Sequence, residues 1–425
     1  MSKIIVGLDI GTTKIACFVG QMNEHGKIEI LSMGKTDSLG VTRGMVSNID
    51  KTILSIRGAV AEAEERIEGE LKINSVNVGI AGQHIKSIQH RGILTRTNLE
   101  NEIAQLDIDR LVDDMYKMAM PPGEQIITVL PQEYIIDNEQ GIKDPIGMSG
   151  VRLEANFHII TGNVGASMNI HKCVERAGLK VKNIILEPIA SADSVLTEEE
   201  KEAGVVLVDI GGGTTDVAIF HEGIIRHTAV IPFGGNVITE DIKEGCTIMK
   251  RKAEMVKQQF GSAVASESQE NVVVSIPGLK GRPAREITLR NLSSIIQARM
   301  EEIIELVHFE IKNSGFEKKL IGGIVVTGGG SQLDHTTQLF EYVTGMDTRI
   351  GYPTEHLANT NNETIKSPMY ATGIGLVLKG FEDMRRSSAS KPADTGAVTT
   401  HSEKTRGSFF DSIVRKSKDW FAEED

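Results

Sequence analysis

The chain has 425 residues, 40% of them hydrophobic, which is enough for two or more domains with proper cores. Its formal net charge of −12 argues against nucleic acid as a main partner, because a phosphate backbone demands a basic surface. The three cysteines, Cys17, Cys173 and Cys246, have no metal-ligand spacing and are interpreted as reduced thiols of a cytosolic protein.

The first predicted element is a β-hairpin over residues 6–18, VGLDIGTTKIACF. Asp9 follows the first apolar run, Gly11 opens the turn, and two threonines and Lys14 follow it. A glycine turn with unobstructed N–H groups is an anion-binding nest. A helix over 48–67, with apolar residues at helical spacing, and a strand over 76–81 complete the first part of a half-domain, residues 1–82.

A small α+β insert is expected at residues 83–162, with strands over 85–96, 125–137 and 151–160 and a helix over 107–120. It interrupts the first half-domain, which resumes at 163–197 and ends in a helix with Pro188 in its first turn. Small residues in this helix and in a later one predict that the two helices cross closely; they are Ala190, Ala192, Ala371, Gly373 and Gly375.

The stretch VVLVDIGGGTTDVAIF, residues 205–220, repeats the first hairpin. Asp209, Ile210 and Gly211 match Asp9, Ile10 and Gly11, and two threonines follow in both copies; the later copy adds Gly212 and Gly213. An ordinary hairpin with a long turn could explain one copy, but hardly two. The repeat predicts two similar half-domains that face each other, with a nucleotide polyphosphate between them and a divalent metal near the two aspartates.

Two further glycine turns follow in the second half-domain, which we divide into residues 198–242, 243–310 and 311–355. Gly234 and Gly235 precede a helix and could approach a nucleotide from below. The segment LIGGIVVTGGGSQ ends a buried strand with Gly328, Gly329 and Gly330, and Ser331 is predicted to be the N-cap of the next helix. Residues 356–383 are expected to return to the first half-domain as a connecting helix.

The chain resembles the actin-like ATPase superfamily in its paired hairpins, residues 6–18 and 205–220, and in the glycine turn at 328–330. This resemblance implies an α/β fold of two half-domains hinged by two connecting helices, with ATP and Mg²⁺ as cofactors and Asp9 and Asp209 near the metal. The implied cofactor contacts are Asp9, Gly11, Thr12, Thr13, Lys14, Asp209, Gly211, Gly212, Gly213, Thr214, Thr215, Gly234, Gly235, Glu254, Lys257, Gly328, Gly329, Gly330 and Ser331.

The same resemblance gives roles to three charged residues. Glu187 matches a position that helps to orient the attacking water in some relatives, and a structural cap is the alternative. Glu254 and Lys257, three residues apart on the helix over 250–260, would reach the ribose and base. A simple exposed ion pair fits their spacing equally well.

Three segments are similar to the FtsA family of cell-division proteins: LPQEYIID at 130–137, residues 144–162, and IPGLKGRPAREITLRNL before the helix over 291–311. The likeness implies an ATP-binding scaffold with weak or no ATPase activity that self-associates at the division site on the cytoplasmic face of the cell membrane. There it would anchor FtsZ and recruit later division proteins. An actin-like pilus-assembly ATPase and a sugar kinase of the same superfold are the alternatives.

The end of the chain reads as a flexible linker, residues 384–407, followed by an amphipathic helix, 408–425. No run of about eighteen apolar residues and no signal peptide is found, so we expect the chain to attach to a membrane surface rather than to cross one. A partner groove is the alternative for this helix. The residues expected to contact lipid are Phe409, Phe410, Ile413, Val414, Lys416, Lys418, Trp420 and Phe421.

Overall fold

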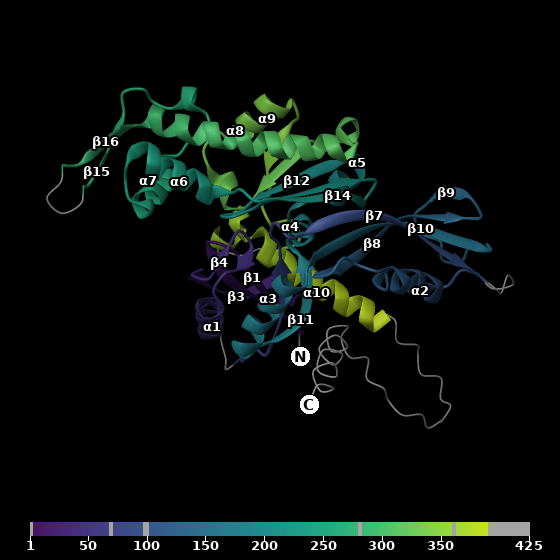
Figure 1. The fold of residues 1–425 in the computed structure, drawn as a ribbon. Coiled ribbons are helices and arrows are strands. Elements are labelled where there is room, and N and C mark those ends of the chain that lie inside the picture. Colours follow the sequence, from purple (N-terminus) through teal and green to yellow (C-terminus); the bar gives the residue numbers. More distant parts are fainter. Residues whose placement is uncertain (1–2, 68–70, 97–101, 279–282, 359–362, 390–425) are drawn as a thin grey trace. The chain divides into compact units, whose positions relative to one another are not determined.

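The computed structural model describes residues 3–67, 71–96, 102–278, 283–358 and 363–389 (Figure 1). The chain divides into two units, Met1–Met384 and Arg385–Asp425. The first unit contains two five-stranded sheets and one four-stranded sheet, in agreement with the predicted α/β fold. The predicted lipid-binding helix, 408–425, lies outside the described residues.

The first half-domain is built on a sheet of strand order β11-β6-β1-β2-β3. β1 pairs antiparallel with β2 in the predicted hairpin and parallel with β6. Because side chains alternate along a strand, Leu8 and Cys17 join one core while Phe18 joins another on the opposite face. The strands are β1 (Ile4–Ile10), β2 (Lys14–Met22), β3 (Ile28–Asp37), β6 (Ser75–Ile80) and β11 (Lys180–Leu186).

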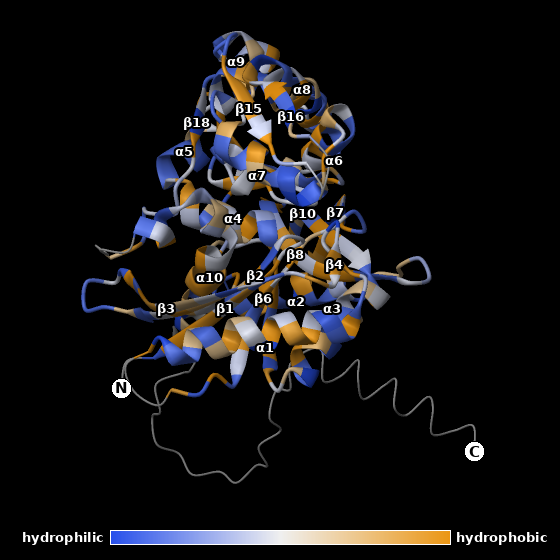
Figure 2. Ribbon diagram, turned by 90° about the vertical axis from the view of Figure 1, so that its left-hand side faces the viewer, coloured by the Kyte–Doolittle hydropathy of each residue, from blue (hydrophilic) through white to orange (hydrophobic). Residues whose placement is uncertain are grey.

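Helices cover both faces of this sheet. α1 (Ile49–Glu65) and α3 (Val164–Arg176) pack on the Leu8 face, and α10 (Ala371–Ala389) packs on the Phe18 face. Asn48 caps α1 by accepting a hydrogen bond from the Lys51 amide, and the helix carries both hydrophobic and hydrophilic colours in Figure 2. A short hairpin of β4 (Val41–Thr42) and β5 (Met45–Val46) precedes α1.

The predicted insert is confirmed as an α+β unit with a sheet of order β7-β10-β8-β9. Its strands are β7 (Lys86–Thr95), β8 (Glu124–Ile136), β9 (Glu139–Ile142) and β10 (Arg152–Asn163), and its helix is α2 (Gln105–Tyr116). Leu111 of α2 packs against Ala155 and Phe157 of β10, so the insert has a core of its own.

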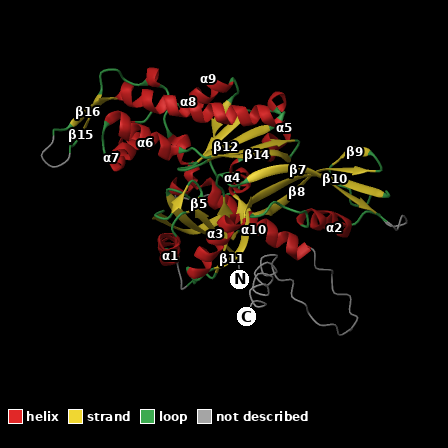
Figure 3. Cartoon of the chain, in the orientation of Figure 1, coloured by secondary structure: helices red, strands yellow, loops and turns green. Residues whose placement is uncertain are grey.

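The second half-domain has a sheet of order β14-β13-β12-β17-β18, with α8 and α9 near it in Figure 3. Val206 and Val208 face a core with α6 and α8, while Leu207 faces the opposite core with α4. The strands are β12 (Val205–Ile210), β13 (Thr215–His221), β14 (Ile224–Ile231), β17 (Ile324–Thr327), β18 (Thr348–Ile350) and the separate pair β15 (Val273–Ile276) and β16 (Arg285–Thr288). The helices are α4 (Glu187–Val195), α5 (Glu198–Ala203), α6 (Gly235–Cys246), α7 (Lys250–Phe260), α8 (Leu289–Ser314) and α9 (Thr336–Thr344).

The close crossing predicted for the two connecting helices is present between α4 and α10. A Cβ atom added at Gly375 would lie 1.8 Å from the carbonyl oxygen of Ala190. The Ser194 hydroxyl donates to the carbonyl oxygen of Ala371 over 2.8 Å. Only glycine at position 375 allows the backbones to come this close.

The insert docks on the edge strand of the second half-domain, which the sequence did not suggest. A β-bulge at Arg226 turns two successive carbonyl groups of β14 outward, and the buried Gln132 amide donates to the Ile225 carbonyl oxygen over 2.6 Å. The His158 ring is 2.9 Å from the Thr228 hydroxyl. β7 and β8 accordingly lie beside β14 in Figure 3.

Two local predictions differ from the structure. Ser331 is not the N-cap of α9, because Gly329–Gln332 forms a 3₁₀ turn and the helix begins later, with His335 as its N-cap. The Ser331 hydroxyl instead donates to the Gly328 carbonyl oxygen. α10 also continues to Ala389, so the first residues of the segment predicted as linker are helical.

Candidate functional site

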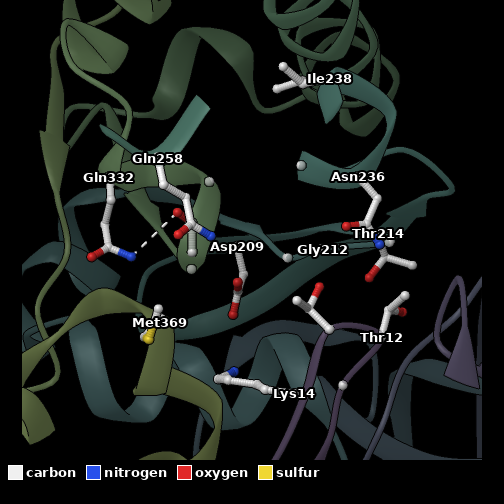
Figure 4. Close-up of a pocket in the computed structure, with 18 of the residues that line it drawn as sticks. Thr12, Lys14, Asp209, Gly212, Thr214, Asn236, Ile238, Gln258, Gln332 and Met369 are labelled. Carbon is white, nitrogen blue, oxygen red and sulfur yellow. Dashed lines mark hydrogen bonds between the residues drawn. The ribbon is translucent and has the colours of Figure 1, made fainter. Parts of the chain in front are cut away.

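Both half-domains line one cavity of about 500 Å³, a volume suited to a small-molecule ligand such as a nucleotide. In Figure 4, Thr12, Thr214 and Asn236 lie at one end of it, Gln258, Gln332 and Met369 at the other, and Asp209 and Lys14 between them. Of the predicted site residues, the following line the cavity: Asp9, Gly11, Thr12, Thr13, Lys14, Glu187, Asp209, Gly211, Gly212, Gly213, Thr214, Gly235, Glu254, Lys257, Gly328, Gly329 and Gly330.

The first hairpin presents a cation beside a carboxylate. Residues Gly11–Thr13 form the turn between β1 and β2, where Ile10 pairs with Ile15. The Lys14 ammonium lies 3.2 Å from the Asp9 carboxylate. Burial opposes its charge, but Asp9 and Asp209 outweigh burial and raise the pKa of Lys14 above its ordinary value. A permanent positive charge therefore faces the cavity, as an anionic ligand requires.

The second hairpin turns through its glycines directly against the first. A Cβ atom added at Gly212 would lie 1.9 Å from the Thr13 hydroxyl oxygen, and one added at Gly213 would lie 2.5 Å from that of Thr12. The turn is closed by a hydrogen bond from the Gly211 amide to the Thr214 carbonyl oxygen. The two turns face each other across the half-domains, as the repeat predicted, and no other residue type fits at their contact.

The start of α6 is tied to the second hairpin by backbone hydrogen bonds. The Gly235 amide donates to the Gly211 carbonyl oxygen over 2.9 Å, and the Asn236 amide donates to that of Gly212 over 2.8 Å. Gly235 and Asn236 therefore stay at the cavity wall, beside the end of α6 that carries partial positive charge.

Three acidic side chains lie in the same wall. Burial raises the pKa of Asp209, and burial together with Asp209 raises the pKa of Asp216 well above its usual range. The carboxyl of Glu187 has its pKa raised by burial and by Asp9, Asp216 and Asp209. The Oδ1 atom of Asp216 is buried and has no hydrogen-bond partner among the described residues. This excess of carboxylates favours a cation or a water molecule as an additional partner.

Glu187 is the first residue of α4, and its side chain does not cap that helix. The N-cap is Leu186, no side-chain hydrogen bond is made there, and Pro188 occupies the next position. The Glu187 side chain instead lies against Gly79, at the end of the first sheet, and lines the cavity. This placement argues against the structural cap as the role of Glu187.

Lys257 and Glu254 sit deeper than a simple exposed ion pair would. The Lys257 ammonium is 2.8 Å from each of the Gly235 carbonyl oxygen, the Thr239 hydroxyl and the Glu254 carboxylate. Burial lowers the pKa of Lys257. All three of its N–H donors are thus engaged, two with α6 and the third with Glu254 of its own helix α7, and Lys257 reaches a ligand only if one of these bonds is exchanged.

Three residues predicted to bind the cofactor lie behind the cavity wall. The buried Thr215 hydroxyl donates to the Phe233 carbonyl oxygen, and Gly234 packs against the Gly211 carbonyl group. Ser331 holds the turn after Gly328. Conversely, several lining residues were not singled out from the sequence: Lys35, Asp37, Asp216, Asn236, Gln258, Gln332, Leu333, Asp334, Met369 and Thr372.

The chain matches two family models. The first, "Cell division protein FtsA", covers residues 206–375, and the second, "SHS2 domain inserted in FTSA", covers residues 82–161. The second match coincides with the four-stranded insert.

Curated relatives match along most of their length. The chain is 42% identical to "Cell division protein FtsA" of Pseudomonas aeruginosa, over 89% of this chain and 90% of the relative. It is 36% identical to the protein of that name from Escherichia coli K12, over 89% and 91%, and 34% identical to that of Bacillus subtilis, over 88% and 83%.

Solved structures show the fold. A "PilM-PilN type IV pilus biogenesis complex" superimposes with a TM-score of 0.64 at 16% identity, covering 88% of this chain and 98% of that chain. MreB5 of Spiroplasma citri bound to ADP superimposes with a TM-score of 0.53 at 14% identity, covering 93% and 99%. At this identity the likeness concerns the architecture alone. The predicted actin-like fold is confirmed.

Proposed function

This chain belongs to the FtsA family of cell-division proteins, and from that premise we propose that it is an ATP-binding, actin-like scaffold of the division site. The observation that carries the nucleotide part of the proposal is the contact of two glycine hairpins, Gly11–Thr13 and Gly211–Thr214, across one cavity. Structures of the same fold with ADP and AMPPNP bound support a nucleotide as the ligand.

A magnesium ion fits the acidic side of the cavity. Mg²⁺ usually takes one or two carboxylates together with phosphate oxygens and water, and Asp209 and Asp9 supply carboxylates there. The unpartnered Asp216 Oδ1 offers a further oxygen for a metal-bound water. When bound, the ion would neutralise phosphate charge. No group of three His, Cys, Asp or Glu side chains among the described residues is arranged to hold a metal ion by itself, so phosphate and water oxygens would have to complete the coordination.

The chain's own groups suit slow turnover or none. Lys14, whose raised pKa favours a positive charge, would face the phosphates, and the hairpin amides would donate to them. Glu187 would orient a water molecule, but its raised pKa favours the protonated form, which cannot accept a proton from that water until a cation relieves the surrounding negative charge. We infer that nucleotide binding, rather than its hydrolysis, sets the arrangement of the half-domains.

The scaffold role rests on the rest of the chain. We propose that it self-associates into actin-like polymers, anchors FtsZ and recruits later division proteins, with the insert used for protein contacts. The predicted amphipathic helix 408–425 would hold it at the cytoplasmic face of the cell membrane. No helix in the described part of the chain is long and apolar enough to cross a bilayer. The match of residues 82–161 to the insert of FtsA favours this role over pilus assembly.

Titration calorimetry with ATP tests the site. Asp209→Ala removes a carboxylate near the proposed metal, and Gly212→Val places a branched side chain at the contact of the two hairpins. We expect both variants to lose measurable Mg²⁺-ATP binding while their thermal unfolding stays cooperative. Unchanged affinity in both would refute the site.

Co-sedimentation with anionic liposomes tests the scaffold. The parent protein should pellet with the vesicles and carry FtsZ with it, and Trp420→Glu should release both by placing a charge in the apolar face. Ser417→Leu, which fills the one polar gap in that face, should tighten attachment. If Trp420→Glu pelleted like the parent, the helix would serve a protein groove instead.

A further inference from the structure

The Asp209 carboxylate is held by two hydroxyl groups from outside its own sheet. Its Oδ2 atom accepts a hydrogen bond from Ser191 over 2.7 Å and another from Thr372 over 3.2 Å. Ser191 belongs to α4 and Thr372 to α10, whereas Asp209 lies near the end of β12. The two hydroxyl oxygens are also 3.0 Å from each other. Three separate elements therefore meet at one carboxylate oxygen, and one of them, α10, is far from the other two in sequence.

These two hydroxyls are not needed to satisfy the helices. A buried serine or threonine in a helix commonly donates to a backbone carbonyl of the preceding turn, as Thr239 does to Gly235 and Ser194 does to Ser191. Ser191 is fully buried and donates to a carboxylate instead, at the short distance typical of a charge-assisted hydrogen bond. The pair thus acts on the acidic residue rather than on the helix backbone.

The bonds fix which way the carboxylate faces. With Oδ2 held by the helices, Oδ1 lies against the third glycine turn, 2.3 Å from where a Cβ atom of residue 328 would stand. Asp209 is thereby confined between Gly328 and the two hydroxyls, and it lines the cavity. A ligating group that is oriented before its ligand arrives loses little freedom when the ligand binds.

The same hydroxyls mark the place where the connecting helices cross. Ser194, one turn after Ser191, donates to the Ala371 carbonyl oxygen next to Thr372. Gly375, one turn after Thr372, allows the contact with Ala190. The two donors to Asp209 therefore lie beside the residues that form the crossing of α4 and α10.

We propose that Ser191 and Thr372 are positioning residues that orient the Asp209 carboxylate for the cation of a bound Mg²⁺-nucleotide, so that the cation-dependent part of nucleotide affinity depends on these two hydroxyl groups. This inference rests on the proposed ATP binding. It assigns to the connecting helices a direct part in ligand binding, in addition to their part as a hinge.

The test compares variants that remove a donor to Asp209 with one that disturbs only the crossing. Ser191→Ala and Thr372→Val remove the donors at nearly constant shape. Thr372→Ser keeps the hydroxyl and is the conservative control. Ser194→Ala is the matched structural control, because its hydroxyl bonds only to the carbonyl oxygens of Ser191 and Ala371.

ATP affinity is measured by calorimetry in excess Mg²⁺ and again in EDTA. Ser191→Ala and Thr372→Val should each bind ATP about tenfold more weakly than the parent in Mg²⁺, since each loses a hydrogen bond to a charged group. In EDTA they should bind like the parent. Ser194→Ala and Thr372→Ser should keep the parental effect of Mg²⁺.

The outcomes separate the possible failures. If the donor variants weakened binding equally with and without Mg²⁺, or if Ser194→Ala lost as much of the Mg²⁺ effect as Ser191→Ala, the hydroxyls would be structural and the inference overturned. A parent protein that bound no ATP under either condition would overturn the proposed function and this inference with it. Should Ser191→Ala fail to fold, Thr372→Val and its serine control still decide.

Discussion

Replacing Gly212 by alanine tests whether the two hairpins work as one site. The added methyl group would lie 1.9 Å from the Thr13 hydroxyl oxygen and 3.1 Å from the Thr13 Cβ atom. Because Thr13 belongs to the first half-domain and Gly212 to the second, the clash is relieved if the half-domains separate. A ligand clamped between the hairpins must bring them together again and so restore the clash.

The size of the effect follows from this distance. The hairpins must move apart by roughly 1 Å, or the Thr13 side chain must leave its rotamer, and overpacking of this kind costs about 1–3 kcal/mol. Each 1.4 kcal/mol is a factor of ten in affinity, so Gly212→Ala should weaken Mg²⁺-ATP binding by roughly 5- to 150-fold.

Calorimetry on a double-mutant cycle provides the measurement. Thr13→Ala removes the hydroxyl that the new methyl group meets, and because Thr13 lines the cavity its own effect on affinity is measured as the second single variant of the cycle. The double variant Gly212→Ala with Thr13→Ala should therefore recover most of the lost affinity. If the double variant bound as weakly as Gly212→Ala, the methyl group would act on the ligand itself. Parental affinity in Gly212→Ala would show that the hairpins do not meet when the nucleotide is bound.

Three further predictions concern stability. Burial and the neighbouring acids raise the pKa of Glu187 in the folded state above its pKa of about 4.5 in the unfolded chain. The stability that protonated Glu187 contributes is therefore fully present below pH 4.5, and it is lost as the pH rises through the pKa of the folded state. Glu187→Gln should therefore be more stable than the ligand-free parent at pH 7, and urea unfolding between pH 4.5 and 8 should show a shallower decline; parallel curves would contradict this. Gln132→Ala leaves the Ile225 carbonyl oxygen without its donor, so the free energy of unfolding should fall by about 1–3 kcal/mol and amide hydrogen exchange in β14 should become faster. Gln89→Ala removes a more exposed hydrogen bond and should lower the free energy of unfolding by less. Gly375→Ala should lower stability by about 1–3 kcal/mol or more at the α4–α10 crossing, while Gly329→Ala, whose methyl group meets nothing within 4 Å, should leave the melting temperature nearly unchanged.

The sequence predicted those parts of the site that depend on short segments. Apolar runs that end in Asp9 and Asp209 and are followed by glycine turns have few alternatives to a hairpin. In the insert, apolar and polar residues alternate clearly enough to locate the strands. Asp216 carried a local signal as well, since it pairs directly with Asp209 across the second hairpin, although it was not singled out from the sequence.

Other residues of the site gave no local signal. Gln258, Gln332 and Met369 reach the cavity from three separate segments, and only tertiary packing brings them together. The docking of Gln132 on β14 depends on a bulge at Arg226 that nothing in the strand pattern marks. Serine is a favoured N-cap residue, but Ser331 lies in the 3₁₀ turn after Gly328, so the helix begins later in the sequence than predicted.

The packing of α10 on the first sheet has a consequence for how the chain is made. Ile5 and Phe18, in the first two strands, share a core with Ile374 and Val377, which follow the whole second half-domain in the chain. The second half-domain is one continuous segment, so its sheet can close while the chain is still growing. The first half-domain must wait, with one apolar face of β1 and β2 uncovered, until α10 has left the ribosome. We expect chains that stall before residue 371 to present that face to chaperones, although they already hold every residue of both hairpins.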